Sequence, residues 1–160
     1  MSKVFLTNFE HPMLIFNIYR HSMMYVIIFK VSFDTLTKIK NQFIKFAQVK
    51  ADEKLLDFGC GTGTLLMMLA TLYPNNELQG VDIDENVLKI AQNKIIKNDM
   101  YVHLKKINGT NLPYEDNYFS KILSSLVIHH ISSENKLIIF EELIRVLKPG
   151  GEIFILDYGK

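Results

Sequence analysis

Short apolar runs alternate along most of the chain with stretches in which apolar residues recur at helical spacing. Short continuous or alternating runs indicate strands, and apolar residues at positions i, i+3, i+4 and i+7 indicate helices. The runs predict five strands, at residues 54–58, 77–82, 101–107, 118–125 and 152–156. The amphipathic stretches predict four helices, one before the first strand and three between strands.

The first predicted helix is marked by its apolar face, and each of the other three has a start or stop signal. The first has an apolar face made of Phe33, Leu36, Ile39, Phe43, Ile44 and Ala47. The second covers residues 64–72 and is broken by Pro74 and the two asparagines after it. Asp84 is a suitable N-cap for the third, which continues to Ile95. Ser132 or Ser133 can cap the fourth, which ends at the Pro/Gly sequence 148–151.

Strands that are separated by helices form parallel sheets, because each crossover places a helix on one face. We therefore expect one α/β domain over residues 32–160, with helices covering both faces of a parallel sheet. Such sheets bind ligands beyond the carboxyl ends of their strands, at the point where the winding reverses.

The N-terminal residues 1–31 carry two apolar runs, 13–16 and 23–29, on either side of Arg20, His21 and Ser22. Neither run approaches the roughly 20 residues that cross a bilayer, so no transmembrane span is expected. No small-residue cleavage site follows them, which argues against a signal peptide. We predict an N-terminal apolar helical segment packed on the domain. The alternatives are a membrane-interface or partner-binding segment, or a lid over a bound small molecule.

Charge and cysteine content exclude several classes of function. Eighteen basic and 17 acidic residues give a net charge of +1, so the chain lacks the basic surplus of a nucleic-acid-binding protein. The one cysteine, Cys60, permits neither a disulfide framework nor a multi-cysteine zinc site, and no metal site is expected. So little cysteine suits a reducing compartment, and we expect a cytoplasmic location.

The turn after the first strand carries the strongest chemical signal. Its three glycines, Gly59, Gly61 and Gly63, stand at every second position, whereas the dinucleotide-binding fingerprint has its third glycine where Thr64 stands. Asp57 directly before the turn would repel a pyrophosphate but suits a ligand with an ammonium and a sulfonium group. That ligand is S-adenosylmethionine, and a nicotinamide oxidoreductase is disfavoured. The alternative is an ordinary tight turn between strand and helix that binds no ligand.

A second carboxylate supports the same ligand. Asp82 ends the second predicted strand, and an acid at that place can accept hydrogen bonds from a ribose diol. The alternative is a helix-capping or surface acid, a task that the neighbouring Asp84 can share.

With these motifs in order, the chain resembles the class I S-adenosylmethionine-dependent methyltransferases, of the small-molecule subgroup that includes ubiquinone- and menaquinone-biosynthesis enzymes. The resemblance runs from about Phe33 to Gly159. It rests on the glycine turn and on four further motifs, Gly80–Asp84, Leu112–Asp116, Ser124–His130 and Arg145–Gly151. It implies a Rossmann-like three-layer αβα sandwich whose parallel strands have the order 3-2-1-4-5.

The resemblance also implies positions for the methionine part of the cofactor. The backbone of Gly59, Cys60 and Gly61 would hold the methionine part, and Asp57 would face its amino group. Ser125, at the end of the fourth strand, would face the cofactor across the switch point. Cys60 is not expected to act as a nucleophile inside this turn.

The rest of the cofactor would lie along the second and third strands. Asp82 would bind the ribose hydroxyls and Ile83 would lie against the adenine. Asn108 and Gly109 stand where the family has an Asp-Ala pair that recognises the adenine amino group through a hydrogen bond. Asn108 replaces an acid, but its amide oxygen can still accept from that amino group, so weaker binding is expected.

Two further departures concern the sheet. Ser120 replaces an aspartate whose role in the family is structural. The family's sheet continues after the fifth strand with a helix and an antiparallel hairpin, which this chain lacks. The fifth strand, 152–156, would then be an exposed apolar edge, which proteins normally cover. We therefore expect either a second copy or a partner at that edge, or a shortened gene product, that is, a truncated methyltransferase homologue.

Methyl transfer from a sulfonium needs a base only when the acceptor must lose a proton. His129 and His130 follow the fourth strand, where the acceptor should lie, and either is a candidate base. Alternatively, one histidine packs against the domain and the other forms a hydrogen bond to the backbone.

The fourth strand is not followed by the Pro-Pro-aromatic or Pro-Cys motif of enzymes that methylate nucleic-acid bases, so a small, apolar acceptor is expected. A catalytically silent cofactor-binding or scaffold protein is the alternative function.

Overall fold

The computed structural model describes residues 3–5, 13–19, 22–29 and 36–158. Its strands form one eight-stranded sheet with the order β1-β2-β3-β8-β7-β4-β5-β6. The parallel part consists of β4 (Lys54–Phe58), β5 (Glu77–Asp82), β6 (His103–Lys106), β7 (Phe119–Ser125) and β8 (Leu147–Tyr158). Read from β6 to β8, these five strands have the predicted order 3-2-1-4-5. The sheet is longer than predicted because three N-terminal strands extend it.

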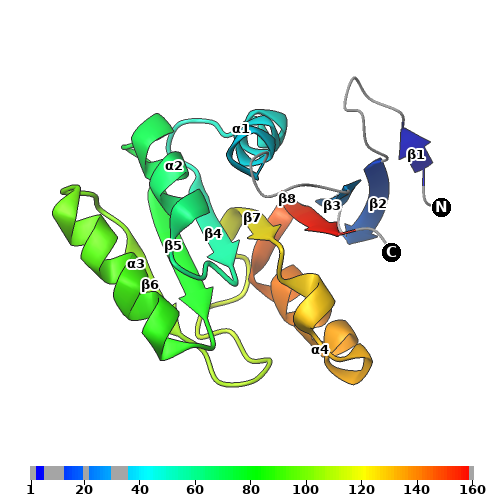
Figure 1. Cartoon of the computed structure of the whole chain (residues 1–160). Helices are drawn as coiled ribbons and strands as arrows, with labels where there is room; N and C mark the ends of the chain where they lie inside the picture. Colours follow the sequence, from blue (N-terminus) through cyan, green and yellow to red (C-terminus); the bar gives the residue numbers. More distant parts are fainter. Residues whose placement is uncertain (1–2, 6–12, 20–21, 30–35, 159–160) are drawn as a thin grey trace.

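Helices cover both faces of the sheet, so the predicted three-layer αβα architecture is confirmed (Figure 1). One face carries α1 (Leu36–Ala47), α2 (Thr64–Leu72) and α3 (Glu85–Lys97). The other carries the short helix η2 (Ile128–His130) and α4 (Ser133–Val146). None of the described helices is long and apolar enough to cross a bilayer.

Alternating strand residues divide the core into two layers, as the two-residue period of a strand requires. In β8, Phe154 and Leu156 pack in the layer under α1, α2 and α3, whereas Ile153 and Ile155 pack in the layer under α4. Leu55 and Leu56 of β4 divide in the same way. A sheet buried on both faces explains why these strands read as continuous apolar runs.

The prediction of an N-terminal helical segment is wrong. This part of the chain forms strands β1 (Lys3–Phe5), β2 (Met13–Tyr19) and β3 (Ser22–Phe29). β1 pairs with β2 and β2 with β3, both antiparallel. The apolar runs are short and rich in β-branched and aromatic residues, which favours strands over helices. Phe33, predicted on the first helix, lies outside the described residues.

The prediction of an exposed edge at the fifth strand is also wrong. β3 lies parallel to β8 along most of its length, from Met23 opposite Glu152 to Phe29 opposite Tyr158. The antiparallel pair β2–β3 therefore extends the sheet on the side where we expected a second copy or a partner. The described strands of residues 1–31 therefore share one sheet with the domain predicted for residues 32–160.

Side chains also anchor β3 to the core. The Tyr25 ring stacks on Phe154 with 4.8 Å between centroids, and its hydroxyl donates to Glu152 at 3.1 Å. Glu152 in turn forms an ion pair with Lys121, which is buried. Lys121 also lies 3.9 Å from the Glu53 carboxylate, so two acidic side chains compensate this buried charge. Through Glu152, the contacts of Tyr25 and Lys121 tie β3, β7 and β8 together.

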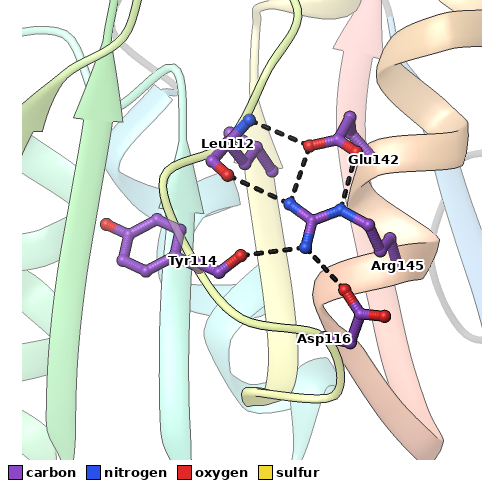
Figure 2. Close-up of polar contacts among 5 residues, drawn as sticks. All are labelled: Leu112, Tyr114, Asp116, Glu142 and Arg145. Carbon is purple, nitrogen blue, oxygen red and sulfur yellow. Dashed lines mark hydrogen bonds and ion pairs between the residues drawn. The ribbon is translucent and has the colours of Figure 1, made fainter.

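Arg145, near the end of α4, holds the segment that joins β6 to β7 (Figure 2). Its guanidinium donates to both carboxylate oxygens of Glu142, at 2.7 and 2.8 Å. It also donates to the backbone oxygens of Leu112 at 3.0 Å and Tyr114 at 2.9 Å, and to Asp116 at 2.8 Å. The bonds to Glu142 and then Asp116 raise the pKa of Arg145 above its ordinary value. The predicted motifs 112–116 and 145–151 therefore meet in one network.

Arg145→Ala is expected to lower the free energy of unfolding by about 2–4 kcal/mol, because two carbonyls lose their donor and the Glu142 carboxylate keeps only the Leu112 amide. Arg145→Lys should recover only part of this loss, since an ammonium cannot reproduce the planar fork. Urea unfolding measures both changes. The control is Lys89→Ala, which removes an exposed pair with Glu85 and should change stability by less than about 1 kcal/mol. Equal effects of Arg145→Ala and Lys89→Ala would contradict the structural role of the network.

Candidate functional site

A cleft of about 930 Å³ opens at the carboxyl ends of β4, β5 and β7. This is the place that the parallel topology predicts for a ligand. The cleft is lined by the glycine turn, by the ends of β5 and β7, by the segment after β6 and by the start of α4. Its lining includes Gly59, Cys60, Gly61, Asp82, Ile83, Asn108, Gly109, Ser125 and His130 from the predicted set. Asp57 and His129 are the two predicted residues that do not line it.

The glycine turn has a backbone that requires glycine. Gly59, Gly61 and Gly63 have φ values of 72°, 53° and 76°, in the left-handed region. The amides of Gly59 and Cys60 both donate to the Val81 oxygen at 2.9 Å, which fixes the turn against β5. A Cβ on Gly59 would lie 2.3 Å from Val127, whereas one on Gly61 would meet no atom within 4 Å. Gly61 therefore leaves open space where a ligand can approach the backbone.

Asp82 stands at the end of β5 with its carboxylate in contact with the turn. Its Oδ2 accepts from the Gly61 amide at 2.8 Å and its Oδ1 from the Asp84 amide at 3.0 Å. Asp84, not Asp82, is the N-cap of α3, and its side chain accepts from Asn86 at 2.8 Å. A carboxylate has about four acceptor sites, so Asp82 retains capacity for the hydroxyls of a ligand.

Two buried polar atoms near the cleft have no hydrogen-bond partner among the described residues. They are Oδ2 of Asp57, on β4, and Oγ of Ser125, at the end of β7. Asp57 lies behind the glycine turn and is only 1% exposed. Its burial raises the pKa of the carboxyl to about 7, although the positive charge of Lys40 opposes this. Orphaned polar atoms at strand ends fit a site that a polar ligand completes.

The opposite wall belongs to β5 and to the segment after β6. Ile83 exposes 66% of its surface, an unusual fraction for a large apolar residue beside a cleft. Asn108 and Gly109 are exposed, and Gly109 has a φ of 71° with no atom within 4 Å of a built Cβ. An apolar face beside an amide group is the environment that a flat heteroaromatic ring requires.

The structure separates the two histidines that the sequence could not tell apart. His130 lines the cleft. The His129 ring instead lies against Asp157, with 2.5 Å between Nδ1 and Oδ1, and its backbone amide donates to Oδ2 at 3.0 Å. The two rings lie 3.9 Å apart between centroids. Asp157 therefore fixes the short helix that carries His130.

The sequence prediction missed several residues of the site, and Lys40, Leu126 and Asp157 show why. Lys40 lines the cleft from α1, and its spacing with Leu36 and Ile44 could have placed it beside the apolar face. Leu126 lines the cleft with a left-handed φ of 64°, a strained conformation that no sequence pattern signals. Asp157 comes from β8 and meets His129 only through the fold.

Cys60 does not have the properties of a nucleophile. Its thiol is buried, and burial together with the charges of Asp57 and Asp82 raises its pKa well above the ordinary range. Since the thiolate is the reactive form, Cys60 is inert at neutral pH. Its sulfur also lies 3.0 Å from where a Cβ on Gly80 would stand, so it packs the turn against β5.

The comparison with known families agrees with this geometry. Residues 55–151, from β4 to β8, match the family model described as a methyltransferase domain. The chain belongs to the class I S-adenosylmethionine-dependent methyltransferases. The family match covers the glycine turn, Asp82, Asn108, Ser125 and both histidines of the site.

Similar proteins carry related names. The chain is 30% identical, over 129 residues, to a demethylmenaquinone methyltransferase from Listeria monocytogenes; the match covers 79% of this chain and 54% of the relative. It therefore spans about half the length of the curated relatives that it matches.

Solved structures extend the comparison. The YcgJ protein from Bacillus subtilis has a TM-score of 0.68 and 25% identity, over 76% of this chain and 50% of the other. Phosphoethanolamine N-methyltransferase 2 from Haemonchus contortus, solved with S-adenosyl-L-methionine, has a TM-score of 0.67 and 27% identity, over 74% and 27%.

Proposed function

We propose that this chain binds S-adenosylmethionine in the cleft and methylates a small, apolar acceptor of the quinol type. The observation that carries the proposal is the cleft itself. It joins a left-handed glycine turn to the Asp82 carboxylate at the carboxyl end of a parallel sheet, beside the buried orphan atoms of Asp57 and Ser125. Membership of the methyltransferase family supports the same cofactor.

Each wall of the cleft suits one part of the cofactor. The turn from Gly59 to Gly61 offers close backbone contact to the methionine part. Asp57 lies behind it, and although burial raises the pKa of its carboxyl to about 7, the ammonium of a bound ligand would favour the ionised form. Asp82 retains acceptor sites for the ribose hydroxyls. Ile83 and Asn108 offer an apolar face and an amide to the adenine. When bound, S-adenosylmethionine supplies an electrophilic methyl group and a neutral thioether leaving group.

The other end of the cleft suits an apolar acceptor. Leu126, Val127, Ile131 and Ile139 line it around η2 and the start of α4. The name of the Listeria relative, a demethylmenaquinone methyltransferase, supports an apolar quinone-derived acceptor. Carbon methylation of a reduced quinone releases one proton as the new bond forms. His130 is the basic side chain on this wall, and we assign it the role of accepting that proton.

No described residue before Lys40 lines the cleft, which gives no support to the expectation that the N-terminal segment is a lid. The buried free thiol of Cys60 supports the expected cytoplasmic location, because free cysteines persist in a reducing compartment.

His130→Ala is expected to lower kcat about 10²- to 10⁴-fold, the usual effect of removing a general base. The affinity for S-adenosylmethionine should stay within about twofold, because His130 lies on the acceptor side. Steady-state kinetics and calorimetry measure the two quantities. His103→Ala, an exposed histidine on β6, is the matched control and should change neither. An unchanged kcat in His130→Ala would remove the histidine from the chemistry.

The proposed function is tested by incubating the protein with methyl-labelled S-adenosylmethionine and chemically reduced demethylmenaquinone. We expect label in the quinone fraction together with an equal amount of S-adenosylhomocysteine. Cofactor binding without transfer to this acceptor or to simple hydroquinones would contradict the acceptor class. It would then favour a cofactor-binding protein without this activity.

A further inference from the structure

Lys40 is a cation that the fold directs to the cleft without an evident partner. It is half-buried on α1, at the edge of the apolar face that includes Ile39 and Ile44. It is the one residue of α1 that lines the cleft. Among the residues that the structure describes, its ammonium forms no hydrogen bond and has no carboxylate oxygen within 4 Å. Burial lowers the pKa of Lys40, and the charge of Asp57 opposes this effect.

Partial burial disfavours the charged form of Lys40, and an anion bound in the cleft would offset this cost. Asp57 is the described carboxylate with the strongest electrostatic effect on Lys40. The Asp57 carboxylate does not form a hydrogen bond with the Lys40 ammonium, and its Oδ2 atom has no hydrogen-bond partner. The second lysine on this side, Lys94, is occupied: its ammonium donates to the Thr62 carbonyl at 2.9 Å and hydroxyl at 3.1 Å.

We propose that Lys40 binds the carboxylate of the cofactor's amino-acid end, and so makes the cleft selective for ligands that carry it. The inference rests on the proposed function. The end of S-adenosylmethionine carries an ammonium and a carboxylate. Asp57 and Lys40, on neighbouring elements beside the glycine turn, present the two complementary charges. Asp82 and Asn108 line the wall of β5 and β6, which leaves the side of α1 to the amino-acid end.

A simpler role must be separated from this one. Lys40 could act only by keeping Asp57 ionised, since its charge opposes the effect of burial on that carboxyl. In that case Lys40 would support ammonium binding, and it would do so for any ligand with an amine. The two roles differ for a ligand that has the ammonium but lacks the carboxylate.

Decarboxylated S-adenosylmethionine is that ligand, and 5′-methylthioadenosine, which lacks the whole amino-acid chain, reports on the nucleoside end alone. Calorimetric titrations with these two and with S-adenosylmethionine compare the wild type, Lys40→Met and Lys45→Met. Lys45 is exposed on the same helix, so its replacement makes the same change of charge and side chain outside the cleft.

We expect Lys40→Met to bind S-adenosylmethionine about tenfold more weakly or worse, the usual effect of losing a charged hydrogen bond. Binding of the decarboxylated ligand should be unchanged or tighter, because it brings an additional net positive charge toward Lys40. Binding of 5′-methylthioadenosine should be unchanged in Lys40→Met, which also shows that the variant is folded. Lys45→Met should resemble the wild type with all three ligands.

Equal weakening of S-adenosylmethionine and its decarboxylated form in Lys40→Met would overturn the inference in favour of an action through Asp57. Unchanged binding of both would overturn it as well, and the proposed function would stand. A wild type that binds none of the three ligands would overturn the inference and the proposed function together.

Discussion

Asp57→Asn is expected to stabilise the ligand-free protein at pH 8 by about 2–4 kcal/mol and to weaken cofactor binding. The wild-type carboxyl is buried, and burial raises its pKa to about 7 from an ordinary value of 3.8. A difference of about three pKa units corresponds to roughly 4 kcal/mol. An asparagine amide has no charge to desolvate, although its unsatisfied donor offsets part of the gain.

The sign of the pH dependence follows from linkage. Between about pH 4 and pH 7 the unfolded chain has already released the Asp57 proton, whereas the folded protein retains it. The folded state therefore binds more protons, and this group's contribution to stability falls as pH rises through that window. Above about pH 7 the contribution is constant and lowest. Asp57→Asn removes this dependence.

Urea unfolding between pH 4 and pH 8 measures the effect in both proteins. Asp52→Asn is the matched control, because Asp52 is exposed and its left-handed φ of 62° suits asparagine. The control should retain the wild-type profile. Calorimetry should show that Asp57→Asn binds S-adenosylmethionine about tenfold more weakly or worse, since its ammonium loses the carboxylate. A wild-type profile equal to that of Asp57→Asn would contradict the buried, destabilising role of this group.

Asp82→Ala is expected to weaken binding of S-adenosylmethionine about 100-fold, and Asp82→Asn by a smaller factor. The alanine variant loses every acceptor for the ribose hydroxyls, each worth about 1.5–3 kcal/mol when the acceptor is charged. It also frees the amide of Gly61, which Asp82 holds at 2.8 Å, so the turn loses its fixed position. Both effects act on the same ligand.

The matched control is Asp84→Asn, two residues away. Asp84 caps α3, and asparagine is an equally good N-cap, so neither stability nor affinity should change much. Thermal unfolding of all three variants separates a loss of binding from a loss of fold. Asp82→Ala with wild-type affinity would place the ribose elsewhere in the cleft.

Local signals were enough to predict most of the sheet. The strands at 54–58 and 77–82 and the helix at 64–72 have the predicted bounds, because each lies between strong turn or glycine signals. Asp84 caps α3 as predicted. The third strand is shorter than predicted, 103–106, because Tyr101 at its start is exposed and pairs with no strand.

The N-terminal strands were mispredicted for a physical reason. Their length and composition suit strands, but a strand is recognised with certainty only when its partner is known. The partner of β3 is β8, more than a hundred residues later in the chain. The stack of Tyr25 on Phe154 and the bond from Tyr25 to Glu152 appear only once that pairing has formed.

The residues of the candidate site also fall into two groups, those that local sequence signals predict and those that only tertiary packing brings to the site. The glycine turn, Asp82 and Asn108 are signalled by residue type and spacing, and all of them line the cleft. Lys40 and Asp157 have ordinary sequence surroundings, and they reach the site only because α1 and β8 pack beside β4 and η2. The bond between His129 and Asp157 also distinguishes the two histidines, because it holds His129 against β8 while His130 lines the cleft. Their adjacent positions in the sequence could not show this difference.

Calorimetric titration of the wild-type protein with S-adenosylmethionine, with NADH as the control ligand, tests the central claim most directly. At pH 8, where the Asp57 carboxyl is largely ionised, the glycine spacing and this carboxylate behind the turn predict saturable binding of S-adenosylmethionine and none of NADH. Binding of NADH, or of neither ligand, would contradict the assignment of the cleft to S-adenosylmethionine.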